Sequence, residues 1–328
     1  MTFTSCRVFK DANGIQHKIV EQADYELVDG TSIIRIDYSG VNYKDALGAT
    51  GKGPIYKSFP INAGIDCAGV LEHTSHSDFN VGDVVLVNGC GLGEVQDGGL
   101  AEYVRVPNDW LVPMPEKLSP RTAMLYGTAG FTAALALDRM INNDQTPDMG
   151  PIVVSGASGG VGSFAITMLS ALGYESIAIT GRPEHHDYLY ELGADKVCSF
   201  DDLQLGTAPL EKACFGGMID NVGGEILSRC IPHINLWGNV ASIGMAAGPK
   251  LNSTVFPFIL RGVSVLGASS TNCPMPRRQR IWQWIADELL TNKIELILEK
   301  EVGLAEVGPC FDEILARKHR GRVIVKCH

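Results

Sequence analysis

The segment 155–162 has the residue types of a phosphate-binding turn, because four of its eight residues are glycines. The apolar residues 152–154 before it predict a short buried strand, and the apolar residues of 161–172 recur at helical spacing. Glycines permit tight backbone angles and close approach of a ligand, while the free N–H groups and dipole of a helix start attract negative charge. The turn therefore predicts a dinucleotide pyrophosphate site, the alternative being a tight turn between packed elements.

The second predicted strand carries the residues that would distinguish NADPH from NADH. It covers Ser176–Thr180 and is followed by Gly181 and Arg182, twenty residues past Gly162. An acidic residue at this place hydrogen-bonds the ribose 2′-hydroxyl of NAD, whereas an arginine pairs with the 2′-phosphate of NADP. The sequence therefore favours NADPH as the cofactor, and the alternative for Arg182 is a solvated surface side chain.

The composition is compatible with a soluble enzyme of moderate size. The chain has 328 residues, 45% of them hydrophobic, which is enough for two hydrophobic cores. Its formal net charge of −10 argues against nucleic-acid or anionic-membrane partners, although a local basic pocket is compatible with it. The N-terminus lacks a signal-peptide pattern, and no apolar run approaches the roughly 20 residues that span a bilayer. We therefore expect a cytoplasmic protein that acts on a small molecule.

The nine cysteines are scattered singly, and no pair of them has CxxC spacing. An odd number of isolated cysteines in a chain without an export signal predicts reduced, mostly buried thiols. Isolated cysteines also argue against a structural zinc site, which usually takes ligands from closely spaced pairs.

Three regions follow from the pattern of strands, helices and turns. Residues 1–120 are β-rich and irregular, and prolines separate them from the next region. Residues 121–267 alternate strands with helices, which is typical of a doubly wound parallel sheet in an α/β domain. Residues 268–328 form a C-terminal segment with a predicted helix over 278–290. Its last strand, Arg322–Val325, is expected to return to the first domain.

Short motifs occur in a fixed order along the chain, at Ser39–Asp45, Phe59–Pro60, Gly64–Val70, Gly98–Tyr103 and Gly127–Ala133, ahead of the glycine turn. In this order they resemble the medium-chain dehydrogenase/reductase superfamily of the zinc-free quinone-oxidoreductase type. Further segments are similar more narrowly to the acrylyl-CoA reductase family, at Asn42–Ala46, Gly51–Gly53, Asp109–Val112 and Pro257–Arg261. The resemblance implies a GroES-like β-rich catalytic domain, a Rossmann NADP-binding domain and a homodimer.

The resemblance also bears on metal binding. Zinc alcohol dehydrogenases of this superfamily supply a cysteine thiolate after the Gly-Val turn and a His-Glu pair in a Gly-His-Glu motif. This chain has Asn42 at the first place and Ile65-Asp66 at the second, and Cys67 lies two positions late. A lone aspartate does not build the tetrahedral N/S site that zinc prefers, so we predict no metal. Without a Lewis acid, the predicted chemistry is hydride addition to an already electrophilic double bond.

Tyr43, Asn42 and Asp45 are the predicted catalytic residues. Hydride addition to a 2,3-unsaturated thioester places negative charge on the thioester oxygen, which hydrogen-bond donors must stabilise. Tyr43 would donate to the substrate or contact NADP, as the resemblance implies, or else is a half-buried structural tyrosine. Asn42 would orient the nicotinamide or the thioester, and Asp45 would fix the loop or a water, or cap a turn. Tyr56 is a rival proton donor in what the sequence predicts to be an exposed loop.

The other cofactor contacts are implied by the resemblance: Ser158, Gly159, Gly160 and Val161 for the pyrophosphate, and Thr180, Gly181 and Arg182 for the 2′-phosphoribose. Met245 and Ser269 would line the nicotinamide side. Arg322 would reach the cofactor from the C-terminal strand, or form a domain-bridging ion pair. Phe200 departs from the pattern, because a basic residue is expected near it in relatives. Arg182 must then contribute more to phosphate binding, and cofactor selectivity would be weaker.

The function predicted from these observations is NADPH-dependent reduction of the double bond of acrylyl-CoA or a similar short enoyl-CoA. A CoA substrate carries several phosphate charges, so we expect a basic rim made of Arg277, Arg278, Arg280, Lys52 and Lys57, unless these are simply solvated surface residues. A quinone or small-enone reductase is the alternative enzyme. An NADPH-binding protein without significant turnover is the alternative from another class.

Overall fold

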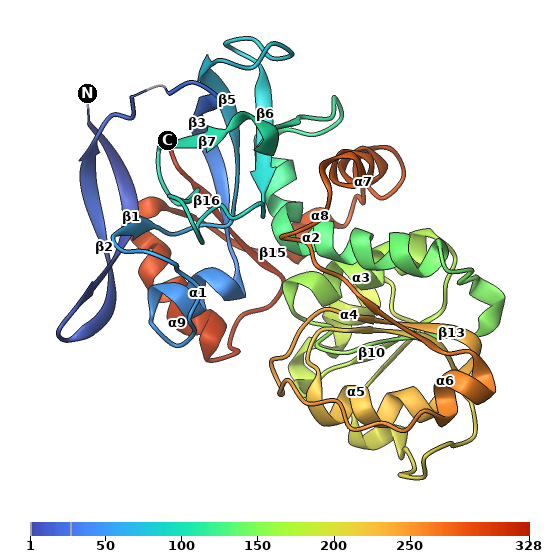
Figure 1. Cartoon of the computed structure of the whole chain (residues 1–328). Helices are drawn as coiled ribbons and strands as arrows, with labels where there is room; N and C mark the ends of the chain where they lie inside the picture. Colours follow the sequence, from blue (N-terminus) through green and yellow to red (C-terminus); the bar gives the residue numbers. More distant parts are fainter. Residues whose placement is uncertain (1, 27) are drawn as a thin grey trace. The chain divides into compact units, whose positions relative to one another are not determined.

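The structure, a computed structural model, describes residues 2–26 and 28–328 and divides into two compact units (Figure 1). Unit 1 contains the chain up to Ala129 together with Ser270–Glu288 and Leu298–His328. Unit 2 contains Gly130–Ser269 and Leu289–Ile297. None of the helices in the described ranges combines the length and apolar character needed to cross a membrane.

Unit 2 contains a six-stranded parallel sheet in the order β11-β10-β9-β12-β13-β14, which confirms the predicted doubly wound α/β fold. The order reverses between β9 and β12, and ligands of such sheets bind outside the carboxyl ends of the strands at this point. The strands are β9 (Ile152–Val154), β10 (Ser176–Ile179), β11 (Lys196–Cys198), β12 (Phe215–Asp220), β13 (Ile234–Ser242) and β14 (Ser264–Gly267).

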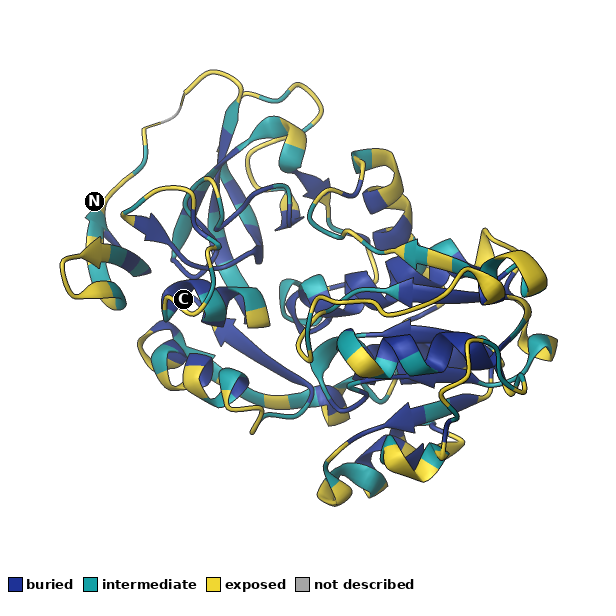
Figure 2. Ribbon diagram, turned by 60° about the horizontal axis from the view of Figure 1, so that its bottom comes forward, coloured by how far each residue is buried: buried dark blue, intermediate teal, exposed yellow. Residues whose placement is uncertain are grey.

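α-Helices connect these parallel strands, as the alternation in the sequence predicts, except between β11 and β12. They are α3 (Gly160–Ala171), α4 (His186–Leu192), α5 (Gly224–Cys230) and α6 (Phe256–Arg261), and the short α8 (Ile294–Ile297) also belongs to this unit. Figure 2 shows the middle of the parallel sheet as buried: the two central strands, β9 and β12, are buried at every residue, whereas the edge strand β14 is only partly buried.

Unit 1 is built from two antiparallel-rich sheets, in agreement with the predicted GroES-like β-rich domain. One has the order β2-β1-β4, and the other β15-β16-β3-β5-β6-β8, with β7 paired to β3. The strands are β1 (Thr2–Asp11), β2 (Gly14–Ala23), β3 (Thr31–Val41), β4 (Ile61–Asn62), β5 (Asp66–Thr74), β6 (Val84–Asn88), β7 (Tyr103–Pro107), β8 (Val112–Pro113), β15 (Leu298–Gly303) and β16 (Arg322–Lys326). The predicted last strand is β16, and it pairs antiparallel with β3.

The helices of unit 1 are α1 (Tyr43–Ala49), α7 (Met275–Asp287) and α9 (Val307–Leu315), together with the first part of α2 (Pro120–Ile141). Helix α2 is interrupted at Gly127, which has φ 49° and ψ −153°. The β1–β2 hairpin, α1, β15 and α9 have no counterpart in the sequence prediction. Helix α1 is short and contains Gly48, so its sequence lacks a sustained apolar period.

The cysteines confirm the prediction of mostly buried thiols. All nine are free, seven are buried, Cys90 is half-buried and Cys214 is exposed. They pack as small apolar side chains, as Cys6 and Cys67 do in the core of unit 1 and Cys230 in that of unit 2.

Candidate active site

The glycine turn of unit 2 is tightly packed on one side and open on the other. A Cβ atom at Gly162 would lie 2.6 Å from Cα of Ala157, so only glycine fits there. Gly156 has φ +58°, a conformation that favours glycine. By contrast, a Cβ at Gly159 would meet nothing closer than 3.4 Å, and one at Gly181 would meet nothing within 4 Å. The turn therefore presents bare backbone at the start of α3, which suits a pyrophosphate.

Arg182 is held beside this turn rather than extending freely into solvent. Its Nη2 donates to Oγ of Ser158 at 3.1 Å, and its backbone N–H donates to Oγ1 of Thr180 at 3.2 Å. The two hydroxyl oxygens are 3.5 Å apart, and both side chains are buried. The structure thus brings Thr180 and Arg182, which the sequence predicts for the 2′-phosphoribose, together with Ser158, which it predicts for the pyrophosphate.

A polar cluster missed by the sequence analysis joins the carboxyl ends of β9 and β12. Oγ of Ser155 donates to Oδ1 of Asp220 at 2.7 Å, and Nδ2 of Asn221 donates to the Ser155 carbonyl at 2.8 Å. Burial raises the pKa of Asp220. The cluster fixes the backbone on both sides of the point where the strand order reverses. The signal available in the sequence was an aspartate at the carboxyl end of a buried strand.

Met245 and Ser269 follow neighbouring strands of the same sheet. Met245 lies in the loop after β13 and is 69% exposed, and Ser269 is exposed after β14. Both strands end at the same edge because they are parallel. Their predicted nicotinamide contacts stay predictions.

In unit 1, Asn42 is the N-cap of α1 and Tyr43 is the first helical residue. Tyr43 is 45% exposed, whereas Asp45 is fully buried. The Asp45 carboxylate accepts hydrogen bonds from the backbone N–H of Asn42 at 2.9 Å and from that of Gly64 at 3.2 Å. Asp45 therefore caps the start of α1, which is one of the roles that the sequence analysis considered for it. Burial, assisted by the charge of Asp66, raises the pKa of Asp45 to about 7.

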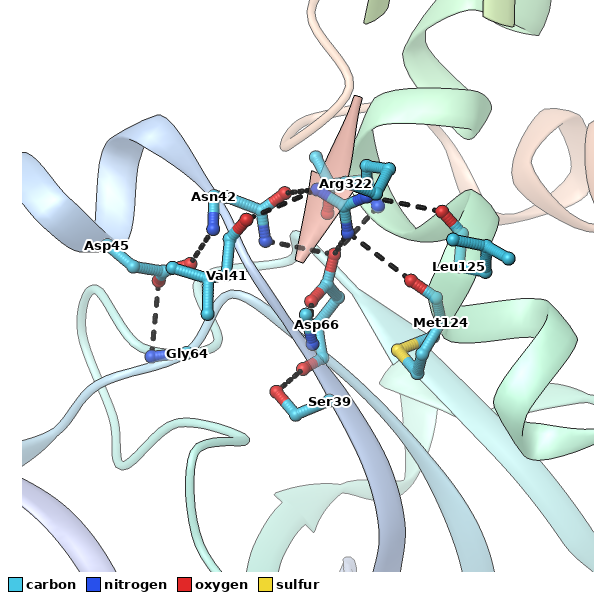
Figure 3. A network of polar contacts seen from close by, with 11 residues as sticks. Ser39, Val41, Asn42, Asp45, Gly64, Asp66, Met124, Leu125 and Arg322 are labelled. Carbon is cyan, nitrogen blue, oxygen red and sulfur yellow. Dashed lines mark hydrogen bonds and ion pairs between the residues drawn. The ribbon is translucent and has the colours of Figure 1, made fainter. Parts of the chain in front are cut away.

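Both polar atoms of the Asn42 side chain form hydrogen bonds inside unit 1 (Figure 3). Its Nδ2 donates to Oδ2 of Asp66 at 3.0 Å, and its Oδ1 accepts from Nη1 of Arg322 at 2.9 Å. The residue is buried. Its amide thus serves first to fix the start of α1, and a contact with the nicotinamide or thioester stays a prediction.

Arg322 is 3% exposed, and all three of its side-chain nitrogens donate within unit 1. The acceptors are the carbonyl oxygens of Leu125, Val41 and Met124, at 3.2–3.3 Å, besides the Asn42 amide oxygen. Nη2 lies 3.9 Å from the Asp66 carboxylate. This ion pair joins β16 to β5 inside one unit. The predicted contact of Arg322 with the cofactor stays a prediction.

Comparisons with known proteins agree with this arrangement. Residues 28–116 match the family model described as alcohol dehydrogenase GroES-like domain, and residues 160–287 match the one described as zinc-binding dehydrogenase. An acrylyl-CoA reductase of Ruegeria pomeroyi is 40% identical over 301 residues, which cover 92% of this chain and 91% of the relative. The Bacillus subtilis protein named "Putative quinone oxidoreductase YhfP" is 41% identical over 325 residues, 99% of this chain and 98% of that protein. The chain belongs to the medium-chain dehydrogenase/reductase superfamily.

Solved structures of this superfamily superpose closely on the chain. The yhdH oxidoreductase from Salmonella enterica, in complex with NADP, has a TM-score of 0.95 at 38% identity and covers 99% of both chains. Bacillus subtilis yhfP, with NAD bound, has a TM-score of 0.95 at 41% identity, again over 99% of both chains. This medium-chain reductase is therefore an oxidoreductase by family, and its relatives differ in the cofactor they were crystallised with.

The places that hold zinc in metal-dependent members carry Asn42, Ile65 and Asp66 in this superfamily member. Within residues 2–26 and 28–328, no group of three or more His, Cys, Asp or Glu side chains is placed to hold a metal ion. Cys67 is fully buried, and burial raises the pKa of its thiol, which disfavours the thiolate that zinc binds.

Two sequence predictions for this reductase were wrong. Tyr56 lies in the core and is not in an exposed loop, because its ring covers Gly48, where a Cβ would be 2.6 Å away. Its hydroxyl has no hydrogen-bond partner among the described residues. Arg278 is fully buried and is not part of a surface rim, since it lies on the same face of α7 as the buried Trp282.

The guanidinium of Arg278 instead holds the end of β6 to the loop that precedes α7. It donates to the carbonyl oxygens of Asn88, Ser270, Thr271 and Cys273. The other predicted rim residues, Arg277, Arg280, Lys52 and Lys57, are exposed. A CoA-binding role for these four stays a prediction.

Proposed function

We propose that this protein reduces the 2,3 double bond of acrylyl-CoA or a similar short enoyl-CoA, using NADPH. The observation that carries the proposal is the buried network of Asn42, Asp66 and Arg322 at the place where metal-dependent relatives bind zinc. Polarising an alcohol for oxidation is difficult without a Lewis acid, whereas an enoyl thioester is already electrophilic. The 40% identity to an acrylyl-CoA reductase over 92% of the chain supports the same substrate class.

The residues after β9 and β10 fit NADPH. The bare backbone at Gly159 and Gly181 leaves room for a pyrophosphate, and Ser158, Thr180 and Arg182 offer two hydroxyls and one cation for a 2′-phosphate. NADPH, when bound, supplies the hydride that adds to the β-carbon of the substrate. The NADP complex of the Salmonella enterica relative supports this choice. Because the Bacillus subtilis relative was crystallised with NAD, the preference of this protein for NADPH over NADH has to be measured.

Unit 1 supplies the groups that meet the charge developing on the substrate. The thioester oxygen gains negative charge as the β-carbon is reduced, and a donor placed beforehand stabilises it without reorganising. Tyr43 is the proposed donor, because its side chain is partly exposed on a helix start fixed by Asn42 and Asp45. The α-carbon then takes a proton to complete the saturated thioester.

A quinone or small-enone reductase is the second candidate, favoured by the 41% identity to the Bacillus subtilis protein named for that activity. Both candidates share the NADPH site and differ in the acceptor. The test is NADPH oxidation measured with acrylyl-CoA, crotonyl-CoA, free enones and quinones. A kcat/KM for acrylyl-CoA that exceeds the others supports the first proposal. Turnover only with quinones supports the second, and NADPH binding with no turnover on any acceptor indicates a binding protein.

We further propose that the protein forms a homodimer through unit 2. Strand β14 is the edge of its parallel sheet, and large apolar side chains are exposed beside it: Leu236 and Trp237 of β13, Ile259 and Leu260 of α6, and Val265 of β14. A contiguous group of exposed apolar side chains marks an interaction surface. Light scattering after size exclusion should give twice the mass of one chain. Trp237→Glu should shift the protein toward the monomer, and Val81→Glu, which alters an exposed valine of unit 1, should not.

A further inference from the structure

Asp66 is the residue on which several elements of unit 1 converge (Figure 3). It begins β5 and is fully buried. Its carboxylate accepts from the backbone N–H of Gly40 at 3.1 Å, from the Asn42 amide at 3.0 Å and from the backbone N–H of Thr128 at 2.7 Å. Arg322 lies 3.9 Å from the same carboxylate. One side chain thus ties together β3, β5, β16, the start of α1 and the interruption in α2.

Two glycines leave the space that this carboxylate and its arginine occupy. A Cβ atom at Gly40 or at Gly127 would lie 2.9 Å from an Asp66 carboxylate oxygen and would also clash with the Arg322 guanidinium. The positive φ of Gly127 interrupts α2 directly before Thr128, whose N–H donates to Asp66. The surrounding backbone is therefore shaped around the Asp66–Arg322 pair.

This pair fixes the residue that precedes Tyr43. The Asn42 amide is held by Asp66 at one end and by Arg322 at the other, and the Asn42 backbone N–H is held by Asp45. Tyr43 follows as the first residue of α1. The direction in which α1 presents Tyr43 therefore depends on the Asp66 carboxylate.

We propose that Asp66 is a positioning residue for the reduction, acting through Asn42 on Tyr43, with Arg322 as its counter-ion. The inference rests on the proposed function, since it takes Tyr43 as the group that meets the substrate. Asp66 itself does not touch the substrate, because its carboxylate oxygens accept from donors inside the fold.

Asp66→Asn tests the positioning, because it puts an N–H group where the carboxylate accepts hydrogen bonds. We expect kcat to fall about 10- to 100-fold, the range for a catalytic group displaced by about 1 Å. The Kd for NADPH should change by less than about 3-fold, because the glycine turn belongs to unit 2. If Asp66 had only a structural role, the Asp66→Asn variant would have a lower melting temperature but would not show this selective loss of kcat.

The exchanged pair Asn42→Asp with Asp66→Asn provides a rescue. It keeps one carboxylate and one amide beside Arg322 and preserves the hydrogen bond between positions 42 and 66. We expect kcat to recover at least about 10-fold over Asp66→Asn alone, as coupled neighbours do in a double-mutant cycle. If Asp66→Asn does not fold, the exchanged pair alone tests the positioning role of Asp66. A folded pair with kcat within about 10-fold of wild type supports the positioning, and a lower kcat overturns it.

Amide hydrogen exchange gives a readout that needs no substrate. Asp66→Asn should speed exchange over residues 40–49 and leave residues 156–162 unchanged. If this exchange pattern is found but the wild-type protein reduces no enoyl-CoA, the proposed function is refuted. The positioning of α1 by Asp66 is still supported in that case.

Asp37→Asn is the matched control. Asp37 is a carboxylate on β3 whose ion pair with Arg35, at 2.7 Å, is partly exposed. This variant should keep the wild-type kcat and exchange pattern. Asp66→Asn that folds and also keeps both would overturn the inference, as would an exchanged pair that folds normally and recovers no activity.

Discussion

Asp45 and Asp66 are two fully buried carboxylates joined through one residue, since Asn42 donates its backbone N–H to Asp45 and its side-chain amide to Asp66. Arg322 is the cation of this network, and it pairs with Asp66. One arginine compensates only one of two carboxylates. Burial, assisted by the charge of Asp66, raises the pKa of Asp45 to about 7, so the network favours a proton on Asp45.

This relationship predicts a pH-dependent stability. The folded pKa of Asp45, about 7, lies above the ordinary 3.8, so the folded state binds the proton more tightly. The stabilisation is complete below pH 3.8 and is lost as the pH rises through 7. The shift corresponds to about 4 kcal/mol at most. Asp45→Asn keeps the side chain neutral, so the stability of wild type relative to this variant should fall between about pH 4 and pH 7 in urea unfolding and change little at higher pH. A pH-independent difference would contradict the assignment.

Cofactor preference should depend mainly on Arg182. A charge-assisted contact with the 2′-phosphate contributes about 1.5–3 kcal/mol, or about 10- to 150-fold in preference for NADPH over NADH. Arg182→Ala should erase most of this preference and change the NADH rate little. Lys196→Ala is the control, because Lys196 is an exposed cation of the same sheet at the amino end of β11. An unchanged cofactor ratio in Arg182→Ala would show that the phosphate is recognised elsewhere.

Metal removal should leave activity intact. The places that bind zinc in metal-dependent relatives carry Asn42, Ile65 and Asp66, and the Asp66 carboxylate is already engaged by Asn42, Thr128 and Arg322. We expect EDTA or phenanthroline to have no effect on kcat, and elemental analysis to find far less than one zinc per chain. About one tightly held zinc per chain would overturn this prediction.

The Rossmann domain could be predicted because the sequence patterns that indicate it lie close together in the chain. A glycine turn lies between a buried strand and an apolar helix, and Arg182 follows the next strand, about twenty residues past the turn. The polar network of unit 1 could not be predicted from the sequence. Arg322 and Asn42 are 280 residues apart, and only the pairing of β16 with β3 brings them together. The burial of Arg278 had a signal, since Arg278, Trp282 and Ile285 recur at helical spacing, but a charged residue is normally placed outside.

Arg278 should matter for stability rather than for CoA binding. Its guanidinium satisfies carbonyl oxygens of Asn88, Ser270, Thr271 and Cys273, and burial lowers its pKa. Arg278→Met leaves these oxygens without their donor and should destabilise the fold by about 3–5 kcal/mol. Arg277→Met, at the exposed neighbouring position, should change the melting temperature little. Equal melting temperatures for the two variants would contradict the structural role of Arg278.

On the proposed function, Tyr43→Phe should lower kcat/KM for acrylyl-CoA by about 10- to 1000-fold, because it removes the proposed donor to the developing charge. The fold should survive, since the ring is kept and the hydroxyl of this 45% exposed residue is not needed for packing. NADPH binding, followed by fluorescence, separates a catalytic effect from a cofactor effect. Tyr190→Phe, which alters an exposed tyrosine of α4, should retain wild-type kcat/KM and serves as the control. A Tyr43→Phe variant that binds NADPH and turns over at the wild-type rate would remove Tyr43 from the chemistry. Backbone N–H groups, or the Tyr56 hydroxyl after a rearrangement that exposes it, would then have to stabilise the enolate.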